Sequence, residues 1–133
     1  MDDEAMLAHP VARVFSHLAE PSRLADWLPE VSGVQAGAAS GAGIGVGFGL
    51  RLRRDGQELS GTGEMIAYEP PWSVAYRLRA GAHTHVLRLT CTVAGGATRV
   101  YVHQAGDGRP LAVDLSVLRQ ALSGDGPVPP DTP

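Results

Sequence analysis

Residues 9–29, HPVARVFSHLAEPSRLADWLP, contain two short helical patterns with a proline between them. Apolar residues recur at the spacing of one helix face over residues 10–19, which predicts a short amphipathic helix. Pro21 breaks this pattern, and a second short helix is expected over residues 22–27 before the next proline ends it. Trp27 lies at the end of the second helix. The stretch therefore predicts a stiff elbow of two small helices that carries an aromatic side chain.

From residue 31 the hydrophobic period changes from that of a helix to two, which predicts β-strands. Within residues 41–54, GAGIGVGFGLRLRR, apolar residues alternate with glycine or arginine, so one face of the strand is buried. The glycines do not match the dinucleotide-binding fingerprint, and we interpret them as places where the strand bends or another backbone lies close. The buried face is expected to consist of Ile44, Val46, Phe48, Leu50 and Leu52.

Turn signals divide the following part of the chain into strands that are linked by hairpins. Asp55-Gly56 is a strong hairpin signal, and Gly95-Gly96 marks a later turn. Consecutive hairpins of this kind predict an antiparallel meander. The expected strands cover residues 57–68, 72–79, 83–93 and 98–105.

The sequence leaves open which face of the strand over residues 57–68 points inward. A one-residue change of register would move every side chain to the other face. In one arrangement Ile66 and Tyr68 face inward, and the carboxylate of Glu64 then enters the interior. In the other arrangement the inward residues are Leu59, Gly61, Gly63, Met65 and Ala67.

A leucine stripe predicts a C-terminal helix over residues 110–123. The Pro- and Gly-rich residues 124–133 are expected to form a disordered tail, because this composition supports neither a helix nor a central strand. We therefore expect a single domain over residues 1–123. The stripe consists of Leu111, Leu115, Leu118 and Leu122.

Composition excludes several classes of protein. The chain has 133 residues, one cysteine and a formal net charge of −3. Cys91 alone allows no intrachain disulfide, and we find no secretory signal or membrane-spanning apolar run, so a cytoplasmic location without membrane insertion is expected. The negative charge argues against a nucleic-acid partner. The arginines of the strands, among them Arg51 and Arg79, are interpreted as a solvated sheet face.

Cofactor and metal sites are not expected. All eleven basic residues are arginine, so the chain lacks the lysine of a Schiff base or a phosphate-binding loop. His83 and His85 have a spacing that can chelate a metal. A third ligand is missing, because Cys91 would lie about 20 Å further along the same strand and His103 has the opposite parity.

Two stretches stand out in this order of elements: HPVARVFSHLAEPSRLADWLP and the downstream YEPPWSVAYRL (residues 68–78). Together with the order of the elements, they resemble the START-like superfamily, also called SRPBCC. Within it, the chain is most similar to the bacterial polyketide cyclase/dehydrase and lipid-transport group. The resemblance covers about residues 3–123 at coarse spacing. It implies an α+β helix-grip fold: a curved antiparallel β-sheet around a C-terminal helix, with two short helices after the first strand.

A helix-grip sheet has a concave face that one helix cannot fill, so a ligand cavity is expected there. The C-terminal pattern is short for this fold, about 21 Å at the helical rise. The cavity is therefore shallower, more open, or completed by the second subunit of a homodimer. Its expected walls are Trp27, Phe48, Leu50, Trp72, Leu87, Gln104 and Leu118.

His85 and Tyr76 are the candidate catalytic residues, because both share the inward face with apolar neighbours. His85 is either a proton-transfer group or a core histidine that bonds a backbone carbonyl. Tyr76 and Gln104 bond either a ligand or a buried water. Trp27 either fills the core, closes the base of the sheet or projects into the cavity mouth.

We therefore expect a protein that binds a small hydrophobic or aromatic molecule in an internal cavity. The resemblance implies catalysis of the cyclisation or dehydration of a polyketide-like carbonyl compound of bacterial secondary metabolism. A non-catalytic carrier or sensor of a lipid-like or aromatic ligand is the alternative, because inward polar groups are scarce. A protein-interaction module, similar to the chaperone activators of the superfamily, is a third reading.

Overall fold

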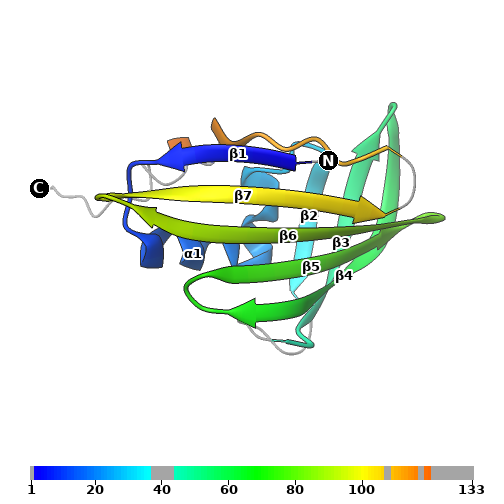
Figure 1. The fold of residues 1–133 in the computed structure, drawn as a ribbon. Coiled ribbons are helices and arrows are strands. Elements are labelled where there is room, and N and C mark those ends of the chain that lie inside the picture. Colours follow the sequence, from blue (N-terminus) through cyan, green and yellow to red (C-terminus); the bar gives the residue numbers. More distant parts are fainter. Residues whose placement is uncertain (1, 37–43, 107–108, 117–118, 121–133) are drawn as a thin grey trace, which may run out of the picture.

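The computed structural model describes residues 2–36, 44–106, 109–116 and 119–120. One antiparallel sheet of seven strands, in the order β1-β7-β6-β5-β4-β3-β2, curves around two short helices (Figure 1). The predicted meander is confirmed, because each strand from β2 to β7 pairs with the next one along the chain. The strands are β1 (Asp2–Leu7), β2 (Val31–Ala36), β3 (Gly47–Arg54), β4 (Gln57–Glu69), β5 (Ser73–Ala80), β6 (His83–Ala94) and β7 (Ala97–Gly106).

The predicted elbow is confirmed as α1 (Val11–Leu18) followed by the 3₁₀ helix η1 (Pro21–Asp26). The buried His17 of α1 lies 2.8 Å from a carboxylate oxygen of Asp26, which ties the two helices together. Helix α1 packs against β6 and β7, and η1 packs against β2. Among the described residues, no helix combines the length and apolar character that a membrane crossing requires.

The inner face of β4 combines both of the alternatives that its sequence leaves open. Gly63 and Met65 are buried in the first part of the strand. The register then shifts between Met65 and Ala67, and after this bulge Tyr68 packs against the core. The carboxylate of Glu64 stays on the outer face, where it accepts a hydrogen bond from Arg77 at 3.3 Å.

Two predicted inward positions are wrong. Ile44 is 72% exposed, because it lies in a turn before β3 in which Gly45 donates a backbone hydrogen bond to Met65. Trp72 is 49% exposed and precedes β5 in a second turn, where its backbone N–H bonds Glu69. Both residues keep the parity of the following strand but lie outside its ladder, so parity does not direct their side chains into the core.

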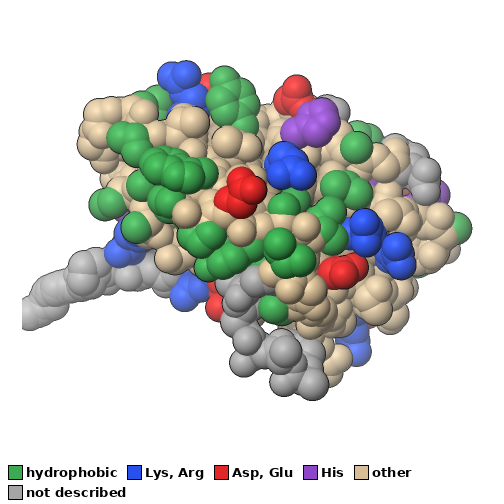
Figure 2. All heavy atoms as spheres, turned by 60° about the horizontal axis from the view of Figure 1, so that its bottom comes forward, with side chains coloured by type: hydrophobic (Ala, Val, Ile, Leu, Met, Phe, Trp, Pro, Cys, Tyr) green, Lys and Arg blue, Asp and Glu red, His purple; other side chains and the backbone are tan. Residues whose placement is uncertain are grey.

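The outer face of the sheet is solvated, as expected. Arg51, Arg53 and Arg79 are exposed there. Figure 2, which views the lower side of Figure 1, shows cationic and anionic side chains interspersed with hydrophobic ones. The interpretation as a solvated face is therefore confirmed for these three arginines, and it is wrong for Arg54, whose side chain is only 9% exposed because it pairs with Glu30.

The segment after β7 differs from the helix predicted over residues 110–123. Residues 111–114 are not helical, so the predicted start of the helix is too early. Helical conformation in the described part of this segment occurs at Leu115, Ser116, Arg119 and Gln120. Leu118 and Leu122 of the predicted stripe, and the predicted tail over residues 124–133, lie outside the described residues.

Side chains from elsewhere hold this segment out of a helix. The amide of Gln104 makes two hydrogen bonds with the backbone of Leu111, at 2.8 and 3.0 Å. A carboxylate oxygen of Glu30 accepts a hydrogen bond from the backbone N–H of Ala112 at 2.7 Å. The carbonyl oxygen of Leu111 thus accepts from Gln104 instead of from a backbone N–H one turn later, and the three bonds tie this non-helical stretch to the sheet.

A largely buried ion pair anchors the same segment to the sheet. Arg54 Nε lies 2.5 Å from Glu30 Oε1, and the two side chains are only 9% and 17% exposed. The guanidinium of Arg54 also donates to the carbonyl oxygens of Arg109 and Pro110, at 2.8 and 2.9 Å. One pair of charges thus joins the end of β3, the start of β2 and the C-terminal segment.

Replacing Arg54 by methionine is expected to lower the free energy of unfolding by about 3 kcal/mol, because the carboxylate of Glu30 stays behind without its buried partner. Urea denaturation followed by circular dichroism measures this loss. Arg53→Met is the matched control: Arg53 is 66% exposed and lies 3.8 Å from Glu58, so its loss is expected to cost less than about 0.5 kcal/mol. Equal losses in the two variants would contradict the anchoring role.

Candidate functional site

The cross-strand register gathers most of the predicted site residues on the inner face. Directly paired residues of neighbouring strands share a face, so the rows below are contiguous. One row contains Phe48, Gly63, Leu78 and His85. The next row contains Met65, Tyr76, Leu87 and Gln104. Leu50 lies in the row on the other side of Phe48, opposite Gly61.

These side chains fill the inner face themselves. The ring of Phe48 covers Gly63, where an added Cβ would lie 2.2 Å from a ring carbon, and it meets Tyr76 edge-on with a centroid distance of 6.1 Å. Tyr76 and Leu87 are fully buried. A few per cent of exposure remains at Phe48, Leu50, His85 and Gln104. The expected cavity wall is thus a packed core at Tyr76 and Leu87. Solvent reaches the other four positions only slightly.

Two groups that could have carried proton or nucleophilic chemistry are held in their neutral forms. The hydroxyl of Tyr76 donates a 2.5 Å hydrogen bond to the carbonyl oxygen of Leu18, and burial, followed by the nearby charge of Glu20, raises the pKa of Tyr76 far above its ordinary value. Burial also raises the pKa of the Cys91 thiol to about 11. Tyr76 therefore anchors α1 to the sheet, and Cys91 is a poor nucleophile at neutral pH.

Gln104 bonds the backbone of Leu111 through both ends of its amide. The sequence predicts a hydrogen bond from Gln104 to a ligand or a buried water, whereas these two bonds go to the C-terminal segment. Gln104 therefore connects the inner face to the segment that covers it.

His85 is buried on the inner face, between Leu78 of β5 and Gly106 of β7 in the cross-strand register. Its ring centroid lies 6.5 Å from that of His83, which is exposed. The described residues contain no group of three or more His, Cys, Asp or Glu side chains arranged to hold a metal ion. His85 is therefore the titratable inward residue around which a chemical role can be proposed.

The remaining predicted wall residues lie elsewhere. Trp27 is fully buried in the core, and within the described structure its indole N–H has no hydrogen-bond partner. Trp72 is half exposed in the turn before β5, so it is not on the inner wall. Leu118 lies outside the described residues.

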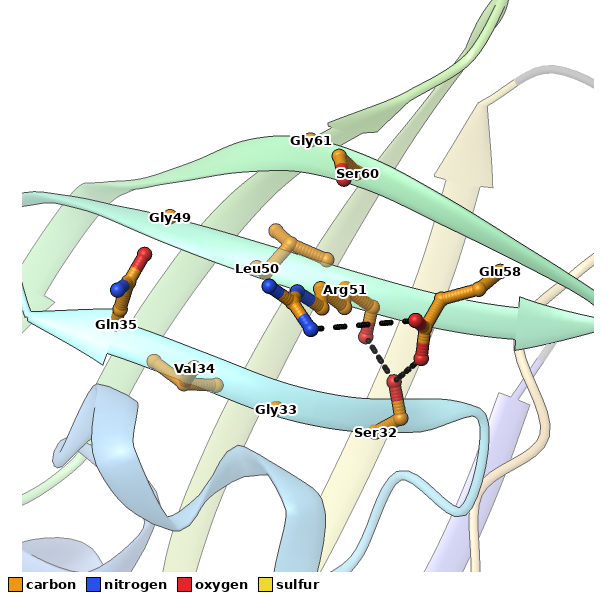
Figure 3. A pocket seen from close by; sticks show the side chains of 10 residues that line it. All are labelled: Ser32, Gly33, Val34, Gln35, Gly49, Leu50, Arg51, Glu58, Ser60 and Gly61. Atoms are coloured by element: carbon orange, nitrogen blue, oxygen red, sulfur yellow. Dashed lines mark hydrogen bonds and ion pairs between the residues drawn. The ribbon is translucent and has the colours of Figure 1, made fainter.

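A groove on the outer face is a feature that the sequence analysis missed. It has a volume of about 330 Å³ and crosses β2, β3 and β4 on the side opposite the core (Figure 3). The signal was present in the strand stretch over residues 41–54, where Gly47 and Gly49 leave the first part of the outward side of β3 without side chains. The groove is lined by Ser32, Gly33, Val34, Gln35, Gly49, Leu50, Arg51, Glu58, Ser60 and Gly61.

A search of protein families matches residues 1–125 to the family described as polyketide cyclase / dehydrase and lipid transport. The resemblance that the sequence analysis states is therefore confirmed. A search of curated proteins found no match.

Solved structures with the same fold come from plants and bacteria. Major latex-like protein 151 from Panax ginseng has a TM-score of 0.68 at 15% identity, with 96% of this chain and 97% of that chain covered. A START superfamily protein from Mycobacterium smegmatis has a TM-score of 0.64 at 16% identity, covering 94% and 86%. A protein from Deinococcus radiodurans has a TM-score of 0.67 at 17% identity, covering 93% and 91%. At these identities the likeness establishes the fold.

Replacing Tyr76 by phenylalanine is expected to lower the free energy of unfolding by about 1–2 kcal/mol, because the carbonyl of Leu18 loses its buried donor. Thermal and urea denaturation measure the loss. Tyr101→Phe is the matched control, since Tyr101 is 43% exposed, and a change below about 0.5 kcal/mol is expected. A Tyr76→Phe variant as stable as the parent protein would show that the hydroxyl is not a structural anchor.

Proposed function

Because the chain belongs to the polyketide cyclase/dehydrase and lipid-transport family, we propose that it binds a small hydrophobic or aromatic molecule on the inner face of its sheet. The observation that carries the proposal is the apolar character of that face. Across the two central rows, aliphatic and aromatic side chains surround the buried imidazole of His85. Burial of apolar ligand surface against such a face supplies binding free energy without charged partners.

The ligand is proposed to enter beside the C-terminal segment. The inner-face residues that keep a few per cent of exposure are Phe48, Leu50, His85 and Gln104. Of these, Gln104 bonds Leu111 of the C-terminal segment directly. Tyr76 and Leu87, by contrast, are fully closed. Binding therefore requires the segment to shift and the ring of Phe48 to move away from Gly63, which makes room between β3 and β6.

The same contacts favour a carrier or sensor over an enzyme. A carrier needs an apolar face, whereas catalysis needs a positioned acid, base or charge stabiliser. Tyr76 bonds a backbone carbonyl and has a raised pKa, and the amide of Gln104 bonds the backbone of Leu111. The proton transfers of a cyclisation or dehydration would thus fall to His85, which is the second candidate function.

Leu50→Ala is expected to weaken the binding of the neutral fluorescent probe N-phenyl-1-naphthylamine by about threefold or more. The reason is that it removes about three buried carbons from the proposed contact surface. Fluorescence titration of the intact protein measures the dissociation constant. Val93→Ala is the control, since Val93 is 57% exposed at the far end of β6. Equal effects of the two substitutions, or no saturable binding of the probe, would remove the inner-face site.

Native mass spectrometry of freshly purified protein distinguishes a carrier from a dehydrating enzyme. For a carrier, the parent protein and His85→Ala release a bound molecule of the same mass. For a dehydrating cyclase, the molecule held by the parent protein is lighter by one water than the molecule held by His85→Ala. We expect equal masses, and a difference of one water would establish the catalytic role instead.

A further inference from the structure

The outer-face groove is hollow because two neighbouring positions on its floor have no side chain. Gly33 of β2 pairs with Arg51, and Gly49 of β3 pairs with Gln35. An added Cβ at Gly33 would meet nothing within 4 Å, and one at Gly49 would meet only Gln35, at 3.6 Å. Neither glycine is required by close packing, so both leave open space above the strands.

Polar side chains that can donate hydrogen bonds surround this floor. Gln35 and Ser60 are directed toward the groove from the strands on its two sides (Figure 3). Neither side chain has a hydrogen-bond or ionic partner within the described part of the chain. The guanidinium of Arg51 lies between them and is 65% exposed.

The carboxylate of Glu58 occupies one end of the groove and leaves the guanidinium of Arg51 available. It accepts a 3.1 Å hydrogen bond from Ser32, and it lies 4.0 Å from Arg51 and 3.8 Å from Arg53. At these distances its ion pairs with the two arginines are loose, and two cations face one anion. A guanidinium has five N–H donors, so Arg51 retains donors for a ligand.

We propose that this groove binds a small polar molecule that carries an oxyanion group, either a carboxylate or a phosphate. The guanidinium of Arg51 donates to the oxyanion in the forked geometry that suits both groups. Gln35 and Ser60 bond the polar body of the ligand over the glycine floor. The volume of about 330 Å³ fits a compact metabolite rather than a polymer. Its polar side chains lie on the opposite side of the sheet from the proposed hydrophobic site, and Leu50, whose side chain belongs to the inner face, lines both.

The test is a titration of the ¹⁵N-labelled protein with inorganic phosphate or with acetate at constant ionic strength. The amide chemical shifts of the protein report the binding. We expect saturable shifts at Gly33, Gly49 and Ser60. Arg51→Gln is expected to weaken binding by about tenfold or more, as the loss of a charge-assisted hydrogen bond implies. Tighter binding of phosphate than of acetate assigns a phosphate ester, and the reverse order assigns a carboxylate.

Two further variants keep the test specific. Arg79→Gln removes the same charge from an exposed outer-face residue of β5 that, in the described structure, neither lines the groove nor pairs with Glu58, so less than about a twofold change is expected. Gly33→Val fills the groove and is expected to abolish the shifts while signals of the other strands stay in place, since its Cβ meets open space. The proposal is overturned if neither anion saturates, if Arg79→Gln weakens binding as much as Arg51→Gln, or if Gly33→Val binds normally.

Discussion

The ion pair between Arg54 and Glu30 is the interaction on which the arrangement of the inner face depends. Its two charges are nearly removed from water, and the remaining donors and acceptors bond the backbone of the segment over residues 109–112. Buried charges are tolerated only when their hydrogen bonds are satisfied in this way. The ion pair therefore ties this non-helical segment to the end of β3 and to the residue before β2, and Leu111 of the segment is buried in the core.

The segment over residues 109–112 helps to close the apolar inner face. Gln104 and the ion pair hold the segment with directional bonds, whereas the contacts beneath it are non-directional packing of Leu111 and its neighbours. Apolar packing can exchange one apolar partner for another, whereas a buried hydrogen bond costs free energy when it is broken. A hydrophobic ligand that replaces protein contacts under the segment therefore costs the fold less than a polar one would.

Alternation along the chain predicted strands β3 to β7 and the inner face of all of them except β4, because side chains in a strand point to alternate sides. The same rule placed Phe48, Leu87 and His85 on one wall, as the register confirms. It failed where pairing between strands decides the outcome. The bulge after Met65 reverses the parity of β4, and the turn before β5 turns Trp72 outward.

Long-range partners explain the other failures. The carboxylate of Glu30 and the guanidinium of Arg54 are separated by 24 positions, and nothing local in either sequence environment indicates their pairing. Residues 111–114 are not helical, and Leu111 and Ala112 bond Gln104 and Glu30, which helical periodicity alone cannot indicate. The outer groove likewise exists only once Gly33 and Gly49 lie on neighbouring strands.

The location of a bound apolar molecule tests the account most directly. Intermolecular nuclear Overhauser effects between N-phenyl-1-naphthylamine and methyl groups of the methyl-labelled protein would report that location. The account predicts contacts to the methyl groups of Leu50 and Leu87, with none to the exposed methyl groups of Ile44 and Val93. Contacts confined to the exposed methyl groups, with the inner face undisturbed at saturating probe, would contradict it.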